Sequence, residues 1–153
     1  MFKLLAVLLA PLMAFASDLP SKKYLNLSAV KTMVAASEAK AKELNVSVTI
    51  CIVDESGNLL FLEKGDTASL NTLQFAQKKA RDAAAYGSPS KEAAESIKKG
   101  NVEALAFPNF FPNQGGLPIR VDSQLLGGIA ASGAKSEIDE QIAQAGLDAL
   151  LAK

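Results

Sequence analysis

The chain has 153 residues, of which 49% are hydrophobic and 21% charged, and its 16 basic residues balance 16 acidic ones. This size and composition are typical of one globular domain that buries a core without staples. Balanced charge, without a polybasic run, excludes the basic surfaces that bind nucleic acid or anionic membranes. With no histidine and one cysteine, the chain also lacks Ser-His-Asp and Cys-His catalysis and the usual tetrahedral zinc sites.

The first residues are typical of a secretory signal peptide. Lys3 supplies a positive charge, residues 4–15 are uncharged and mostly apolar, and Ala14-Phe15-Ala16 has the small-x-small pattern of a cleavage site. The apolar run is too short to span a membrane as a helix, although a short anchor or a buried N-terminal helix is the alternative. We therefore expect a signal peptide over 1–16 and a single mature domain over 17–153. That domain would be periplasmic or secreted, with no stable membrane insertion after cleavage.

A helix followed by a hairpin is predicted after the polar lead-in. Asn26 is the expected N-cap, Asn45 can end the helix in the left-handed conformation, and apolar residues follow helical spacing between them: Val30, Met33, Val34, Ser37, Ala41 and Leu44. The alternating pattern over 46–53, turn residues over 54–58 and a returning strand over 59–63 predict an antiparallel hairpin.

A second helix is predicted over 69–86, ended by Gly87, with an inward stripe of mostly small residues: Leu70, Leu73, Ala76, Ala80, Ala83 and Ala84. Small residues let another element approach this face closely. A short helix over 90–99, closed by Gly100, follows, and residues 101–116 are expected to be irregular.

The remaining chain predicts a second hairpin and a last helix. Its strands cover 117–121 and 125–132, and Gly127-Gly128 inside the second strand indicates a bulge or a close backbone contact. Residues 136–139 resemble a capping box, with an acid three residues after the serine. Hairpins separated by helices predict an α+β fold, in which helices cover an antiparallel sheet.

An aromatic loop (residues 107–116) is the most distinctive segment. Its three phenylalanines, two prolines and two final glycines form an apolar rim with exposed backbone. Phe110 and Phe111 could stack on a flat ligand, with Phe107 beside them, while Gly115 and Gly116 would let a ligand or another backbone approach. The alternative is that these rings are buried in the core or in an oligomer interface.

Other candidate sites are weaker. Ser132-Gly133, before a helix N-terminus, could receive an anion, or form a simple strand-to-helix turn. The acidic pairs Glu92/Glu95 and Glu137/Glu140 could hold a hard cation, although a solvated helix face explains them as well. We therefore assign no metal site. The lone Cys51 lies in a predicted strand, where a packed core thiol without a disulfide is expected.

Short motifs lie in a distinctive order and spacing over residues 24–150. They are Val53-Asp54-x-x-Gly57, Ala76-x-x-Lys79-Ala80, Gly115-Gly116-Leu117-Pro118-Ile119, Leu126-Gly127-Gly128-Ile129, Ser132-Gly133, Asp139-Glu140, Ala143 and Gly146. Together these motifs resemble the haem-degrading domain family, which includes HbpS-like and GlcG-like proteins and the C-terminal domain of PduO-type cobalamin adenosyltransferases.

The resemblance implies a mainly antiparallel sheet of four to five strands flanked by helices, a homo-oligomer, and haem binding as in some members. Lys79, which matches the family's lysine, could pair with a carboxylate such as a haem propionate, helped by Arg81; an ordinary exposed charge is the alternative. Relatives ligate haem iron through histidine, which this chain lacks. An iron ligand here would be Tyr24, Tyr86, Cys51, a methionine or a lysine, or none.

These observations favour an exported protein that binds haem or a related tetrapyrrole, rather than an enzyme with catalytic side chains. One alternative is a binder or enzyme acting on a small 2-hydroxy acid such as glycolate. Another is a self-assembling structural or stress protein without a small ligand. The predicted ligand-binding residues are Lys79, Arg81, Phe107, Phe110, Phe111, Gly115, Gly116, Ser132 and Gly133.

Overall fold

The computed structural model describes residues 19–152, so the predicted signal peptide over 1–16 lies outside the described residues. The elements follow the predicted order. In sequence they are α1 (Leu27–Glu43), β1 (Thr49–Asp54), β2 (Leu59–Lys64), α2 (Thr72–Tyr86), α3 (Ser90–Lys98), the 3-10 helix η1 (Val102–Ala106), β3 (Gly116–Val121), β4 (Gln124–Ser132) and α4 (Ser136–Leu151).

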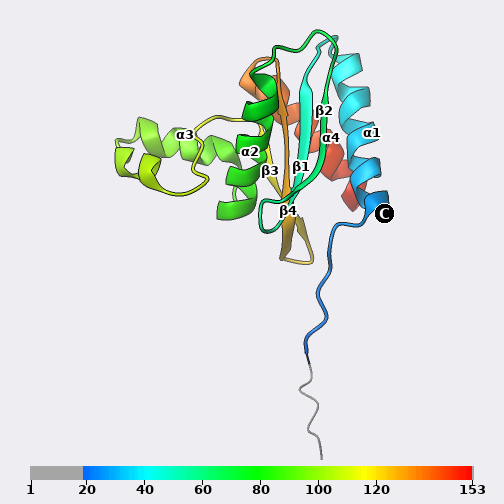
Figure 1. The fold of residues 1–153 in the computed structure, drawn as a ribbon, viewed down its shortest axis with the longest axis horizontal. Coiled ribbons are helices and arrows are strands. Elements are labelled where there is room, and N and C mark those ends of the chain that lie inside the picture. The colour runs from blue at the N-terminus through cyan, green and yellow to red at the C-terminus, as the bar shows by residue number, and fades with distance from the viewer. Residues whose placement is uncertain (1–18, 153) are drawn as a thin grey trace, which may run out of the picture.

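The four strands form one sheet in the order β2-β1-β4-β3, and each neighbouring pair is antiparallel. α1 and α4 pack together on one face and α2 covers the other, while α3 extends to one side of this layered body (Figure 1). The α+β prediction, with an antiparallel sheet between helices, is therefore confirmed. Within residues 19–152, no helix is both long enough and apolar enough to cross a membrane.

Local signals at the helix ends fix most element boundaries. The Asn26 side chain accepts a hydrogen bond from the Ala29 N–H at 2.8 Å, as an N-cap should. Asn45 and Gly87 adopt the predicted left-handed conformation, with φ of 53° and 63°. The first strand begins at Thr49 rather than residue 46, because the Val46 N–H bonds back to Ala41 O at 3.0 Å and completes the exit from α1.

Two predictions at helix starts are wrong, one of a boundary and one of a capping box. α2 begins at Thr72, after a turn in which the Thr72 N–H bonds to Ser69 O, so Leu70 is 81% exposed instead of facing inward. At α4 the N-cap is Lys135, without a side-chain cap bond, so Ser136 does not form a capping box. The Asp139 carboxylate reaches back to the Ala134 N–H at 3.0 Å instead.

The two faces of the sheet are packed differently. Toward α1 and α4 the core consists mostly of large apolar side chains, including Met33, Ile52, Ile119 and Ile129. Toward α2 it consists of smaller ones: Cys51, Val53, Ala76, Ala80, Ala84 and Ala130. The small residues bring α2 close to the sheet, as their stripe predicts.

Glycines in β4 allow this close approach. A Cβ on Gly128 would overlap the carbonyl oxygen of Ala80 on α2, and one on Gly127 would overlap that of Val53 on β1. The register between β3 and β4 also shifts between Ile119 and Arg120, leaving Leu126 unpaired beside Gly127. The prediction of a bulge or a close backbone contact at these glycines is thus confirmed.

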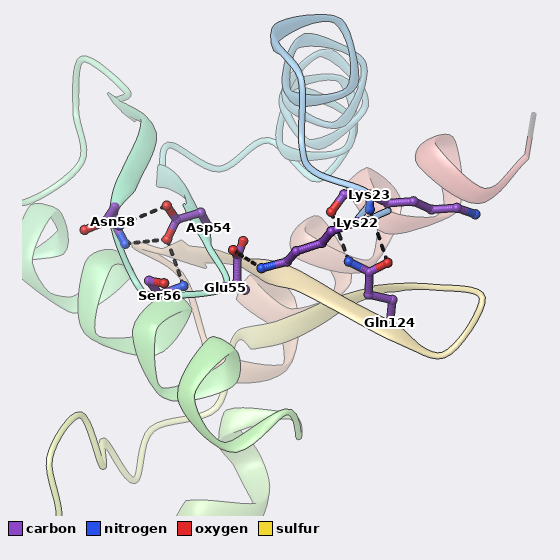
Figure 2. A network of polar contacts seen from close by, with 7 residues as sticks. All are labelled: Lys22, Lys23, Asp54, Glu55, Ser56, Asn58 and Gln124. Carbon is purple, nitrogen blue, oxygen red and sulfur yellow. Dashed lines mark hydrogen bonds and ion pairs between the residues drawn. The ribbon is translucent and has the colours of Figure 1, made fainter. Parts of the chain in front are cut away.

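The segment before α1 is held by both hairpin turns. Lys22 forms an ion pair with Glu55 at 2.6 Å in the first turn. The backbone of Lys23 exchanges two hydrogen bonds with the Gln124 side chain at the second hairpin (Figure 2). The Lys23 ammonium pairs with Asp122 in the same turn. These exposed contacts connect the two hairpins at one end of the sheet.

Candidate functional site

A cleft of about 290 Å³ lies between α2 and the aromatic loop, lined by Lys78, Arg81, Asn109, Phe110 and Phe111. α2 supplies the two cations and the loop supplies the two rings and the amide. The loop can stand beside α2 because Gly87 ends the helix and the chain returns through α3 and η1. Apolar walls with a few placed polar groups are typical of small-molecule sites.

Phe111 forms one wall of this cleft and is held on three sides. Its ring lies 5.7 Å from that of Phe75, centroid to centroid, and the Lys78 ammonium lies 5.5 Å from the centroid of the Phe111 ring. Its backbone N–H donates to an Asp82 carboxylate oxygen at 2.8 Å. These contacts hold the half-buried ring in position, and the part of the ring that remains exposed can contact a ligand.

Phe110 is positioned by Tyr86, at the end of α2. The two rings meet edge to face, with centroids 5.9 Å apart, and the Tyr86 hydroxyl donates to Pro108 O at 2.7 Å. Phe107 is 56% exposed and does not line the cleft. The structure therefore brings two of the three predicted phenylalanines together.

Arg81 lines the cleft and also connects it to the first hairpin. Its Nε donates to Gly57 O at 3.1 Å, in the turn between β1 and β2. The guanidinium keeps further N–H donors beyond this bond, which suit a carboxylate or another anion.

Lys79 does not line the cleft, contrary to the prediction. Its neighbour Lys78 does, and because adjacent helical residues point about 100° apart, Lys79 faces the protein interior. Its side chain is 2% exposed and donates to Asp139 Oδ2 at 2.8 Å and to Ala131 O at 3.2 Å. The alternative of an ordinary exposed charge is therefore wrong. Burial raises the pKa of Asp139 even though the Lys79 ammonium opposes the shift. Lys79 ties α2 to β4 and α4, and its neighbour Lys78 lines the cleft.

The predicted glycines and Ser132 do not line the cleft either. A Cβ on Gly116 would overlap Lys79 O, and one on Gly115 would lie 2.9 Å from Lys79 Nζ, so these glycines admit protein atoms. Ser132 is 3% exposed at the end of β4, and a Cβ on Gly133 would lie 2.7 Å from Ser47 O. Another backbone thus approaches Gly116, as one of the two alternatives had it, whereas the side chains of Lys79 and Asp139 approach Gly115.

Asp82 is an acid that the sequence analysis did not select. It is 1% exposed, and burial raises its pKa to about 6, although the bond from the Phe111 N–H lowers it. It lines a small cavity of about 170 Å³ together with Tyr86, Ser88, Glu92, Ala93, Ser96 and Phe110. It lies three residues after Lys79, at the margin of the buried face of α2 and off the stripe of small residues, so no sequence signal revealed it.

Within residues 19–152, no group of three or more acidic or cysteine side chains could hold a metal ion. The predicted acidic pairs are divided among other contacts. Glu140 pairs with Lys91 of α3 at 3.0 Å, and Glu92 lines the small cavity. The expected core position of Cys51 is confirmed, and burial raises the pKa of its thiol to about 12.

Comparisons with known proteins agree with this architecture. The family model described as haem degrading protein HbpS-like matches residues 25–148. Protein GlcG of Escherichia coli K12 is 31% identical over 112 residues, covering 73% of this chain and 84% of GlcG. A double-mutant form of HbpS from Streptomyces reticuli is 28% identical, with a TM-score of 0.78, over 90% of this chain and 94% of that one. A structure described as a PduOC:heme complex is 27% identical, with a TM-score of 0.77, over 83% of this chain and 95% of that one.

Proposed function

This chain belongs to the HbpS-like family of haem-degrading proteins, and from that premise we propose that it binds haem or a related tetrapyrrole in the cleft between α2 and the aromatic loop. The observation that carries the proposal is the pairing of two phenylalanine walls with two cations in one hollow. The haem complex of PduOC, a protein of the same fold, supports the choice of ligand.

The residues of the cleft fit the two parts of such a ligand. A tetrapyrrole is flat and apolar over most of its surface, which suits the half-buried rings of Phe110 and Phe111. Its carboxylates suit Lys78 and Arg81, which supply ammonium and guanidinium donors. Lys78 and Arg81 would thus hold the ligand's acidic groups, and the rings would hold its plane.

Any iron ligation would not use histidine, since the chain has none. Cys51 and Met33 are fully buried in the core, and the Tyr86 hydroxyl donates to Pro108 O. Lys78 has the one amine among the residues that line the cleft. Because Lys78 holds a carboxylate of the ligand, we infer that no side chain of the cleft ligates the iron, and a bound haem would supply a redox-active iron.

A small 2-hydroxy acid is the second candidate ligand, and the size of the cleft favours it. About 290 Å³ is near the lower end of ligand pockets, which span roughly 300–1,000 Å³. A small hydroxy acid would fit inside, with its carboxylate on Lys78 and Arg81, whereas a tetrapyrrole would extend beyond the hollow.

Export and self-association complete the proposal. The signal-like segment over 1–16 supports a periplasmic or secreted mature protein. Exposed apolar side chains around η1, namely Val102, Leu105 and Phe107, support a homo-oligomer, because contiguous exposed apolar groups often mark interfaces. The alternative function, self-assembly without a small ligand, would use the same exposed groups as its interface.

Haem titration of the purified mature protein tests the ligand. We expect a saturable Soret shift that Phe111→Ala and Lys78→Ala weaken about tenfold. Phe107→Ala is the matched control, because it removes an aromatic ring from the same loop but outside the cleft. A parallel thermal-shift panel with glycolate and lactate separates the second candidate. No saturable haem binding by the wild-type protein would overturn the haem proposal.

A further inference from the structure

We propose that Asp82 is the positioning residue of this cleft and makes it sensitive to protons. Its carboxylate holds the Phe111 wall through the backbone N–H of that residue, and protonation loosens the wall. The effect on ligand binding rests on the proposed function, whereas the effect on the wall does not.

The geometry places Asp82 at the anchor of the loop. Its carboxylate oxygen lies 2.8 Å from Phe111 N, and the side chain is 1% exposed. The loop is also tied to the body through Pro108, whose carbonyl accepts from Tyr86, and Asn113, whose carbonyl accepts from Ser90 at 2.7 Å. Of these three ties, the one at Phe111 ends on an ionisable acceptor and holds a residue of the cleft wall.

Few other ionisable groups lie around Asp82. The aromatic loop has no ionisable side chain. In the small cavity, the other ionisable groups are Tyr86 on α2 and Glu92 on α3. The nearby lysines of α2 have other partners, since Lys79 pairs with Asp139 and Lys78 lies over the Phe111 ring. Asp82 therefore has a backbone N–H rather than a cation as its partner.

Burial raises the pKa of Asp82 to about 6, and the Phe111 N–H lowers it from a still higher value. A hydrogen bond that lowers an acid's pKa is stronger to the charged form, so protonation must weaken it. Above about pH 6 the wall is held by a charge-assisted bond, and below that pH by a weaker neutral one. Because Asp82 lines the small cavity and not the cleft, its charge acts on the wall rather than directly on the ligand.

The Phe111 amide resonance of the ligand-free protein tests the wall directly. In a pH titration followed by ¹H–¹⁵N NMR, we expect this resonance to move with a midpoint near pH 6. Asp82→Asn keeps an acceptor but cannot titrate, so the movement should disappear. Glu92→Gln removes the other carboxyl group of the cavity and should leave the midpoint unchanged. A wild-type resonance that does not titrate, or one silenced by Glu92→Gln, overturns the proposal.

The consequence for binding is measured with haem at pH 5 and pH 7.5. We expect wild-type affinity to fall at least fivefold more than that of Asp82→Asn between pH 7.5 and pH 5. The comparison between the two proteins cancels the titration of the haem carboxylates. Equal pH dependence in both proteins would overturn the regulatory inference. If the wild-type protein binds no haem, the proposed function fails, and the Phe111 titration alone decides the role of Asp82.

Discussion

The two faces of the sheet bury different chemistry. The face toward α1 and α4 is filled by large apolar side chains, whereas the face toward α2 is lined by smaller ones, from Cys51 and Val53 to alanines. α2 itself also buries Lys79 and Asp82. Because the side chains between them are small, the α2 backbone lies so close to the sheet that charged residues of α2 are removed from water. The cleft is built along this second helix. The first face therefore mainly stabilises the fold. On the second face, burial of charged side chains costs free energy, and the same helix positions the cleft.

The largest effect should come from breaking the buried ion pair that joins Lys79 of α2 to Asp139 of α4. Lys79→Ala leaves Asp139 buried without its cation, which costs about 3–5 kcal/mol in the free energy of unfolding. Urea denaturation measures this loss. The double replacement Lys79→Met with Asp139→Leu should recover part of it, because no buried charge is left unpaired. The recovery is incomplete, since the Ala134 N–H loses the Asp139 carboxylate as its acceptor. A single variant as stable as the wild type would mean that the pair is not buried as described.

Neighbouring residues of β4 offer a sharper comparison, because Gly128 faces α2 and Ile129 packs in the core on the opposite face. Gly128→Ala should cost about 1–3 kcal/mol, since the added methyl group must push the α2 backbone away. Ile129→Val removes one methylene and should cost about 0.5–1.5 kcal/mol. Thermal unfolding of both variants gives the order. If Gly128→Ala is the milder change, α2 is not tightly seated on the sheet.

The smallest change is expected at Asp82, since Asp82→Asn keeps the size and the acceptor. An acid whose pKa rises from 3.8 to about 6 on folding stabilises the fold when protonated. This contribution is complete below pH 3.8, is lost as the pH rises to about 6, and stays absent above it. The stability of Asp82→Asn relative to wild type should therefore increase between pH 4 and pH 6 and then level off. A flat difference from pH 4 to pH 8 would contradict the raised pKa.

The sequence predicted the arrangement of the fold well because its signals are local. Asn26, Asn45 and Gly87 end elements through their own backbone and side-chain preferences, and alternating apolar residues define strands wherever their neighbours lie. The start of α2 was missed because Leu70 fits the apolar period, while a turn before Thr72 places it outside the helix.

The cleft was predicted only in part, because the direction in which a side chain points depends on contacts between segments that are distant in the sequence. Phe110, Phe111 and Arg81 were selected and do line it, but Lys78 was passed over for Lys79. Lys79 is one helical turn after Ala76 on the small-residue stripe, which in retrospect indicates burial rather than access. Its partner Asp139 comes from α4, 60 residues later, and no local pattern joins two such positions.

The burial of Cys51 has a practical consequence for labelling the aromatic loop. Its thiol is fully buried in β1, and with a pKa of about 12 it is almost entirely un-ionised at neutral pH. Maleimide and disulfide reagents should therefore leave the native chain unmodified. A spin label or fluorophore can then be attached to a cysteine introduced at Phe107 in an otherwise wild-type background, and it would report changes in the aromatic loop from a single position.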